Sequence, residues 1–304
     1  MSGIRVLLLL ALAGLGLCFV VILLKDLVAM SRDRGRGSGV PEFSWIPNWR
    51  QTATGFVTTF FDTLGIGNFA TTTALFRAWR LVPDERIPGT LNVGHTLAAV
   101  LGAFIFIQLV PVATSTLVPM IAAAMLGAWL GAGIVAGLSR YRVRVGMGVA
   151  LLAAAIIMTL TQLKLLPGGG SALGLQGPSI GLAVAANLVL GGLMTLGIGL
   201  YAPCMIVVSL LGMNPQAAFP IMMGSCAFLM TISGARFVQK RRYHPGAAIG
   251  LTVGGVPALL IAALLVKAMP IALLRWVVIV VVLYTSATLL RAARRERAET
   301  RSAA

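Results

Sequence analysis

Acidic side chains, and charged side chains in general, are scarce in this sequence. Only 8 of the 304 residues are Asp or Glu, and 11% of the residues are charged, whereas a soluble domain carries roughly a quarter. Hydrophobic residues make up 58% of the chain, and the mean hydropathy is +0.95. So few charges cannot cover the surface of a soluble domain of this size. The composition is typical of a polytopic membrane protein.

Histidine and cysteine are also rare. The chain has two histidines, and its three cysteines, Cys18, Cys204 and Cys226, lie inside apolar runs without metal-ligand spacing. No nucleophile, base and acid occur as a set, so we expect no catalytic residues, no metal, no cofactor and no enzymatic activity. The net charge of +16 does not indicate nucleic acid, because the cations stand in short runs between apolar segments, where they set membrane orientation.

A nine-residue motif occurs twice in the chain. Asp62-Thr63-Leu64-Gly65-Ile66-Gly67-Asn68-Phe69-Ala70 returns as Met194-Thr195-Leu196-Gly197-Ile198-Gly199-Leu200-Tyr201-Ala202, 132 residues later. Two prolines keep the same offset, since Pro83 pairs with Pro215 and Pro88 with Pro220. A constant offset without a gap indicates an internal repeat.

The apolar segments divide the chain into five parts. Residues 1–50 are predicted to form an N-terminal transmembrane helix, 4–24, and a basic cytoplasmic linker that is flexible over 31–39. The helix is too long for a signal-peptide core, so we interpret it as uncleaved. The first repeat is 51–166, a Gly-rich linker is 167–178, the second repeat is 179–290, and a basic cytoplasmic tail is 291–304. Interrupted segments are expected at 51–79 and 179–211, and single helices at 90–112, 116–138, 145–165, 217–237, 247–266 and 271–290.

The positions of Lys and Arg indicate how the interrupted segments run. If every segment crosses once, the cations are only weakly biased toward one side. If each interrupted segment enters and returns to the same side, only four of the 24 Lys and Arg residues lie outside: Arg5, Lys164, Lys267 and Arg275. Three crossings then remain per repeat, so the repeats are inverted and the two breaks meet near the midplane. A kinked single crossing stays open as the alternative.

The predicted fold is therefore an all-α polytopic membrane protein. It has two inverted repeats, each a broken or re-entrant helix pair plus three transmembrane helices, after one extra N-terminal helix. The expected location is the cytoplasmic (inner) membrane, with many passes and a cytoplasmic C-terminus. The chain is expected as a monomer or homodimer in the lipid bilayer.

The glycine breaks have the chemistry of an anion site. Two glycines separated by one residue let the backbone leave helical geometry, and a new half-helix then begins near Asn68 or Leu200 with free N–H groups and a positive dipole end. Packing notches without a ligand are the alternative. The candidate substrate-binding residues are Thr63, Gly65, Gly67, Asn68, Asn92, Thr195, Gly197, Gly199, Tyr201 and Ser225.

Asp62 is the one acidic residue that the predicted helices place at membrane depth, and its counterpart in the second repeat is Met194. An intramembrane carboxylate costs roughly 2.5–3.5 kcal/mol, so we interpret Asp62 as a proton carrier, with a structural cap as the alternative. His95, early in the next helix, is a candidate proton relay to Asp62, or a structural histidine. His244 is expected to be solvated in a basic loop.

With its duplicated break and the prolines that follow, the chain resembles the TauE/SafE family of sulfite exporters over residues 51–290. Members of that family often carry a fuller Gly-x-Gly-Gly-Gly pattern, where this chain has only Gly-Ile-Gly in both copies. The resemblance implies a secondary transporter that exports sulfite, an organosulfonate or another small organic anion. Coupling to protons and alternating access by rocking of the repeats are the expected mechanism. An anion channel, or a transporter of an unrelated carboxylate, stays open as the alternative.

Overall fold

Helices make up most of the part of the protein that the computed structural model describes. The described residues are 3–34, 46–64, 67–83, 86–134, 141, 145, 148–149, 152, 155–156, 159–160, 162–163, 165, 170–194, 200–268 and 271–302. Among them, four helical stretches are long and apolar enough to cross a membrane: Gly3–Arg32, Ile87–Leu109, Pro215–Gln239 and Pro245–Leu265. The prediction of an all-α, membrane-embedded protein is confirmed at this level.

The chain forms two compact units, and each unit takes segments from both halves of the sequence. The first unit contains Met1–Thr63, Gly67–Leu109 and Met223–Leu265. The second unit contains Leu64–Ile66, Val110–Met222 and Val266–Ala304. The spatial division therefore does not follow the boundary between the predicted repeats.

The first unit is built from helices of both halves. It holds α1 (Gly3–Arg34), α2 (Trp49–Thr63), α3 (Asn68–Ala78), α4 (Ile87–Gly94), α5 (Thr96–Leu109), α10 (Ala218–Gln239) from Met223 onward, and α11 (Pro245–Ala268) up to Leu265. The helix expected at 90–112 begins earlier, because Pro88 stands in the first turn of α4, where a missing N–H is tolerated. It is also divided at His95, which lies in a turn between α4 and α5.

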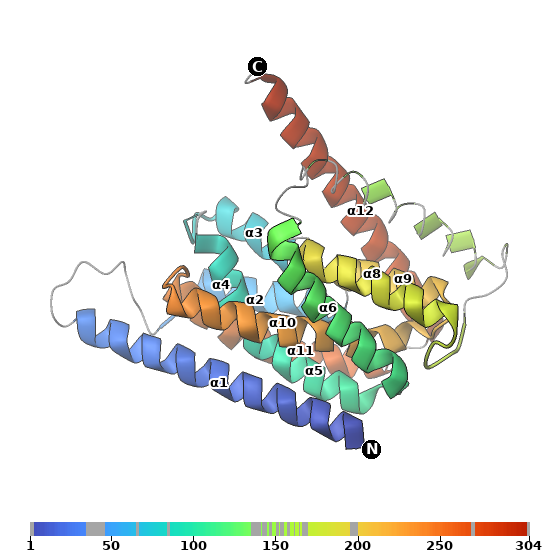
Figure 1. Ribbon diagram of the computed structural model, residues 1–304. Helices are drawn as coiled ribbons and strands as arrows, with labels where there is room; N and C mark the ends of the chain where they lie inside the picture. The colour runs from blue at the N-terminus through green and yellow to red at the C-terminus, as the bar shows by residue number, and fades with distance from the viewer. Residues whose placement is uncertain are drawn as a thin grey trace. The chain divides into compact units, whose positions relative to one another are not determined.

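The N-terminal helix is longer than predicted. Helix α1 continues to Arg34, so the first residues of the expected flexible linker are helical, and residues 35–45 lie outside the described part. Helix α1 lies alongside α5 and α10 (Figure 1), and its buried Phe19 ring reaches the surface of Gly234 on α10.

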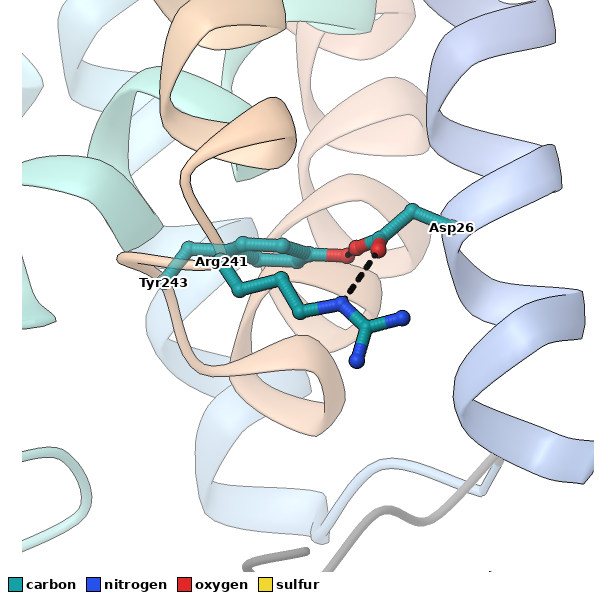
Figure 2. Close-up of polar contacts among 3 residues, drawn as sticks. All are labelled: Asp26, Arg241 and Tyr243. Atoms are coloured by element: carbon teal, nitrogen blue, oxygen red, sulfur yellow. Dashed lines mark hydrogen bonds and ion pairs between the residues drawn. The ribbon is translucent and has the colours of Figure 1, made fainter. Parts of the chain in front are cut away.

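A polar contact fixes the C-terminal part of α1. Figure 2 shows Arg241 and Tyr243, from the loop between α10 and α11, both pointing at the carboxylate of Asp26. The Arg241 Nε lies 3.1 Å from one carboxylate oxygen, and the Tyr243 hydroxyl donates to the other at 2.8 Å. In the same loop, His244 was expected to be solvated, but it is half-buried and its Nδ1 accepts a hydrogen bond from the Ala247 N–H in the first turn of α11.

The second unit contains α6 (Thr114–Ile134), α8 (Pro178–Met194), α9 (Tyr201–Leu210), the 3₁₀ helix η3 (Pro215–Ala217) and α12 (Ile271–Ser302). Helices α6 and α8 pack closely, because Gly127 faces the Leu188 carbonyl and Gly191 faces the Ala124 carbonyl. Helix α12 continues to Ser302, so residues 291–302 of the expected basic tail are helical.

The Gly-rich linker is tied to its surroundings where it is described. The Ala172 N–H donates to the Gly212 carbonyl at 3.3 Å, and the Asn214 N–H donates back to Ala172 at 2.8 Å. The Ala113 N–H, just before α6, donates to the Leu173 carbonyl at 2.7 Å. The linker thus holds the loop after α9 and the start of α6 together.

The two halves exchange packing partners. In the first unit, Gly55 of α2 faces the backbone of Leu251 on α11, which belongs to the second half. In the second unit, Asn187 of α8 donates to the Met120 carbonyl of α6, which belongs to the first half. Asn187 is the counterpart of Gly55 at the offset of 132 residues. Each half therefore packs its interrupted segment on a helix of the other half, while inversion of the repeats stays a prediction.

Candidate functional site

Helix α2 is polar on its buried side and apolar on its exposed side. Its buried residues follow the helical period and comprise only polar residues and one glycine: Gln51, Thr54, Gly55, Thr58, Thr59, Asp62 and Thr63. Phe56, Val57 and Phe61 are exposed. A soluble helix has the opposite arrangement, so α2 suits an apolar solvent outside and a polar interior.

The chain breaks where the first pair of glycines predicts. Helix α2 ends at Thr63 and α3 begins at Asn68, while Gly65 lies outside the described residues. Gly67 precedes α3 with φ of +80° and ψ of +132°, a conformation that is essentially restricted to glycine. The N-cap residue of α3 is Gly67, which has no side chain to bond the free N–H groups of the first turn at the positive end of the helix dipole.

Two candidate residues meet across this break. The Asn68 Nδ2 donates a hydrogen bond of 3.2 Å to an Asp62 carboxylate oxygen. Each side chain is 7% exposed. Asp62 stands in the last turn of α2 and Asn68 in the first turn of α3, so an acid and an amide donor face each other at the end of one helix and the start of the next.

Most threonines of the two helices bond to their own backbone. Thr54, Thr58 and Thr63 on α2 donate to carbonyls four residues earlier at 2.7–2.8 Å, and Thr73 on α3 does the same at 2.7 Å. Such bonds satisfy a hydroxyl inside an apolar environment.

Thr59 and Thr72 differ, because both hydroxyls point to His95. The Thr59 Oγ1 lies 3.3 Å from His95 Nδ1, and the Thr72 Oγ1 lies 3.2 Å from Nε2. All three residues are buried. A neutral imidazole has one donor and one acceptor nitrogen, and a hydroxyl can match either, so the ring is satisfied without an ionic partner.

The contacts of His95 show that the chain bends at the break. Two hydrogen bonds and an imidazole ring together put the Thr59 and Thr72 hydroxyls at most about 9 Å apart. The 13 residues from one to the other would span about 20 Å along a straight helix. Helices α2 and α3 therefore do not form one straight helix but bend toward each other at the break, and we call this pair, within the first unit, the first hairpin.

Three predicted substrate-binding residues of the first unit do not take part in the contact between Asp62 and Asn68. The Thr63 hydroxyl is fully buried and bonded to the Thr59 carbonyl. Asn92 connects α4 to α10, because its Oδ1 accepts from the Ser233 hydroxyl at 2.7 Å while its Nδ2 donates to Pro88. Ser225 is buried on α10. A substrate-binding role for each of them stays a prediction.

The second break is described only at its ends. Helix α8 ends at Met194, and α9 begins at Tyr201 without a side-chain cap, one residue from the predicted start. Tyr201 is buried in the second unit. Thr195, Gly197 and Gly199 lie outside the described residues. That the two breaks converge stays a prediction.

Five polar residues of the first hairpin and of the His95 turn have no polar equivalents in the second half, whereas Thr63 is matched by Thr195. The five, on α2, α3 and the turn before α5, map to apolar or small residues at the same offset. Thr59, Asp62, Asn68, Thr72 and His95 correspond to Gly191, Met194, Leu200, Cys204 and Ala227. Both halves therefore share the glycine motif, while these five polar side chains occur only in the first half.

No protein-family profile, curated protein or solved structure matches this chain. Inferences about function therefore depend on the sequence motif and on the geometry of the first hairpin. In the described part of the chain, no three His, Cys, Asp or Glu side chains gather to hold a metal ion.

Sequence reasoning missed Thr59 and Thr72. The available signal was the polar period of α2, which marks Thr58 and Thr59 alike. Only the direction of the two hydroxyls, toward Thr54 or toward His95, distinguishes them.

Proposed function

We propose that this protein is a secondary transporter of the cytoplasmic membrane that moves a small anion of the sulfite or organosulfonate class. The observation that carries the proposal is the buried polar stripe of α2, which leads to the uncapped N-terminus of α3. Polar side chains on a membrane-embedded helix mark substrate pathways. The resemblance of the same break to the TauE/SafE motif supplies the substrate class.

The first turn of α3 is the part that binds the anion. Gly67 has no side chain to cover the N–H groups there, and the helix dipole favours a negative ligand. The Asn68 amide adds a donor beside them. Taken by itself, α9 presents the same element, because no side chain caps its start at Tyr201. No Lys or Arg is needed, and a site without a fixed cation releases its ligand more readily.

Asp62 couples the anion to a proton. Its carboxylate already accepts a hydrogen bond from Asn68, so an ionised Asp62 and a bound anion compete for the same donors. Two like charges about 5 Å apart repel by about 3 kcal/mol at an effective dielectric constant of about 20, which is about two orders of magnitude in affinity. Protonation of Asp62 removes this repulsion, so a proton and the anion bind together. By alternating access, an exporter then carries both outward down the gradient of the anion.

The test measures binding and flux of an alkanesulfonate, whose own charge is constant between about pH 5 and 8. With purified protein in liposomes, we expect saturable flux and an affinity that increases as the pH falls. Asp62→Asn resembles the protonated side chain, so we expect high affinity that no longer depends on pH. Asp26→Asn is the matched control, because Asp26 lies in the contact between α1 and the α10–α11 loop, and it should keep the wild-type pH dependence.

Each part of the proposal can fail separately. An Asp62→Asn protein with the wild-type pH dependence refutes the coupling role. A current that rises linearly with voltage and does not saturate with substrate indicates a channel. Absence of both binding and flux for sulfite and for alkanesulfonates refutes the substrate class.

A further inference from the structure

We infer that His95 is the positioning residue of the first hairpin, which it holds closed through Thr59 and Thr72, and that it does not carry protons. This inference rests on the proposed function for its consequence in transport, but its structural part can be tested without transport.

The hairpin has two cross-connections, one turn apart. The outer one is the Asp62–Asn68 hydrogen bond at the break. The inner one is formed by His95, whose partner Thr59 lies three residues before Asp62 and whose partner Thr72 lies four residues after Asn68. Three or four residues make one helical turn, so the inner connection supports the outer one from the same face of both arms.

The inner connection comes from outside the hairpin. His95 lies in the turn between α4 and α5, which leaves the Gly94 carbonyl to accept a hydrogen bond of 2.8 Å from the Thr252 hydroxyl on α11. Helix α11 also closes behind Thr59, because a Cβ on Gly255 would lie 2.8 Å from the Thr59 Oγ1. The ring is thereby fixed by α4, α5 and α11, and it can impose a fixed separation on α2 and α3.

The surroundings of the ring do not suit a proton relay. Both nitrogens are occupied by hydroxyls, and the ring is 0% exposed. The Thr59 hydroxyl faces the ring from α2 and the Thr72 hydroxyl faces it from α3. Behind Thr59, Gly255 of α11 lies against the Thr59 side chain and next to Ala98 of α5. Asp62, one turn away on α2, is the titratable group nearest to Thr59 along that helix, and its carboxylate accepts a hydrogen bond from Asn68.

The sequence of the second half agrees with a specialised role. Ala227 occupies the position equivalent to His95, and Gly191 and Cys204 occupy those of Thr59 and Thr72. All three members of the inner connection are thus replaced together. Joint replacement is expected of residues that act together through their hydrogen bonds.

The experiment measures the hairpin directly. Nitroxide labels are placed at Val57→Cys on α2 and Arg77→Cys on α3, both exposed, in a Cys18→Ser background, because Cys204 and Cys226 are buried. We expect a narrow distance distribution in the parent protein. His95→Ala, Thr59→Val and Thr72→Val should each broaden it or shift it to longer distances. The two Val variants keep the shape of threonine, so they decide the question even if His95→Ala does not fold.

The matched controls are the neighbouring threonines. Thr58→Val and Thr73→Val remove hydroxyls that bond only to their own helix, and they should leave the distance distribution unchanged. Thr59→Ser and Thr72→Ser keep the hydroxyl and should restore the parent distribution.

Transport supplies the second measurement. Loss of one buried hydrogen bond corresponds to about a fivefold change, so we expect the KM for an alkanesulfonate to rise about fivefold in Thr59→Val and Thr72→Val. The pH profile should keep its midpoint in these variants and in His95→Gln. An unchanged distance distribution in His95→Ala, Thr59→Val and Thr72→Val overturns the positioning role. A shifted or abolished pH profile in His95→Gln overturns it in favour of a proton carrier. If no variant and no parent protein transports the anion, the proposed function fails while the distance measurement still decides the role of His95.

Discussion

Replacing Gly55 with alanine tests the exchange of helices between the two halves. A Cβ at this position would lie 2.6 Å from both the Cα and the carbonyl oxygen of Leu251 and 3.0 Å from the Gly250 oxygen. These are backbone atoms, so no side-chain rotation can relieve the contact. To reach an ordinary contact of 3.4 Å, α2 and α11 must separate by about 0.8 Å.

The expected cost is that of overpacking, about 1–3 kcal/mol. For a protein of this size it corresponds to a decrease of about 2–6 °C in the melting temperature of the detergent-solubilised protein. The sign of the effect is decisive. Alanine is favoured over glycine in a helix by about 1 kcal/mol, so Gly55→Ala would raise the melting temperature if α2 were not packed on α11.

Gly14→Ala on α1 is the matched control. Nothing lies within 4 Å of a Cβ at Gly14, so this variant should melt at the wild-type temperature or slightly above it. If Gly55→Ala melts no lower than Gly14→Ala, the contact between α2 and α11 is not the one described.

Three further outcomes can be measured with the same preparation. Gly67→Ala forces a side chain into φ of +80°, so we expect a loss of about 1–3 kcal/mol in stability and weaker anion binding, and unchanged binding would argue against the site. Thr252→Val removes the hydroxyl that donates to the Gly94 carbonyl and should cost about 1 kcal/mol, whereas Thr252→Ser should not. Burial and the hydrogen bond to Asp26 raise the pKa of Tyr243, in the α10–α11 loop, above its ordinary value of 10.0. Its stabilising contribution is then complete below pH 10.0 and decreases above it, so melting curves from neutral to high pH should show a smaller loss of stability in Tyr243→Phe than in the parent.

The hairpin geometry also changes how the candidate residues are interpreted. From the sequence alone, His95 is a candidate proton relay to Asp62 or a structural histidine. In the structure they belong to different connections of the hairpin, since Asp62 bonds to Asn68 and His95 bonds to two threonines. The two residues therefore have different proposed roles. Asp62 carries the charge at the break, and His95 positions the helices one turn away from it.

The sequence by itself determined the class of the protein and the places where its helices break. Low charge and long apolar runs leave only a membrane-embedded helical fold, because unsatisfied backbone groups are too costly in lipid. Paired glycines in apolar segments predicted the starts of α3 and α9 to within one residue, since glycine locally removes the preference for helix.

Tertiary structure alone decided which helices pack together and which polar groups meet. The partners of Gly55 and His95 lie far along the chain or on other helices, and no local pattern specifies them. The helical period places both Thr58 and Thr59 on the buried face of α2 and does not distinguish them. The choice between them depends on where α11 and the turn at His95 approach that face, and such an approach is set by close packing between distant segments.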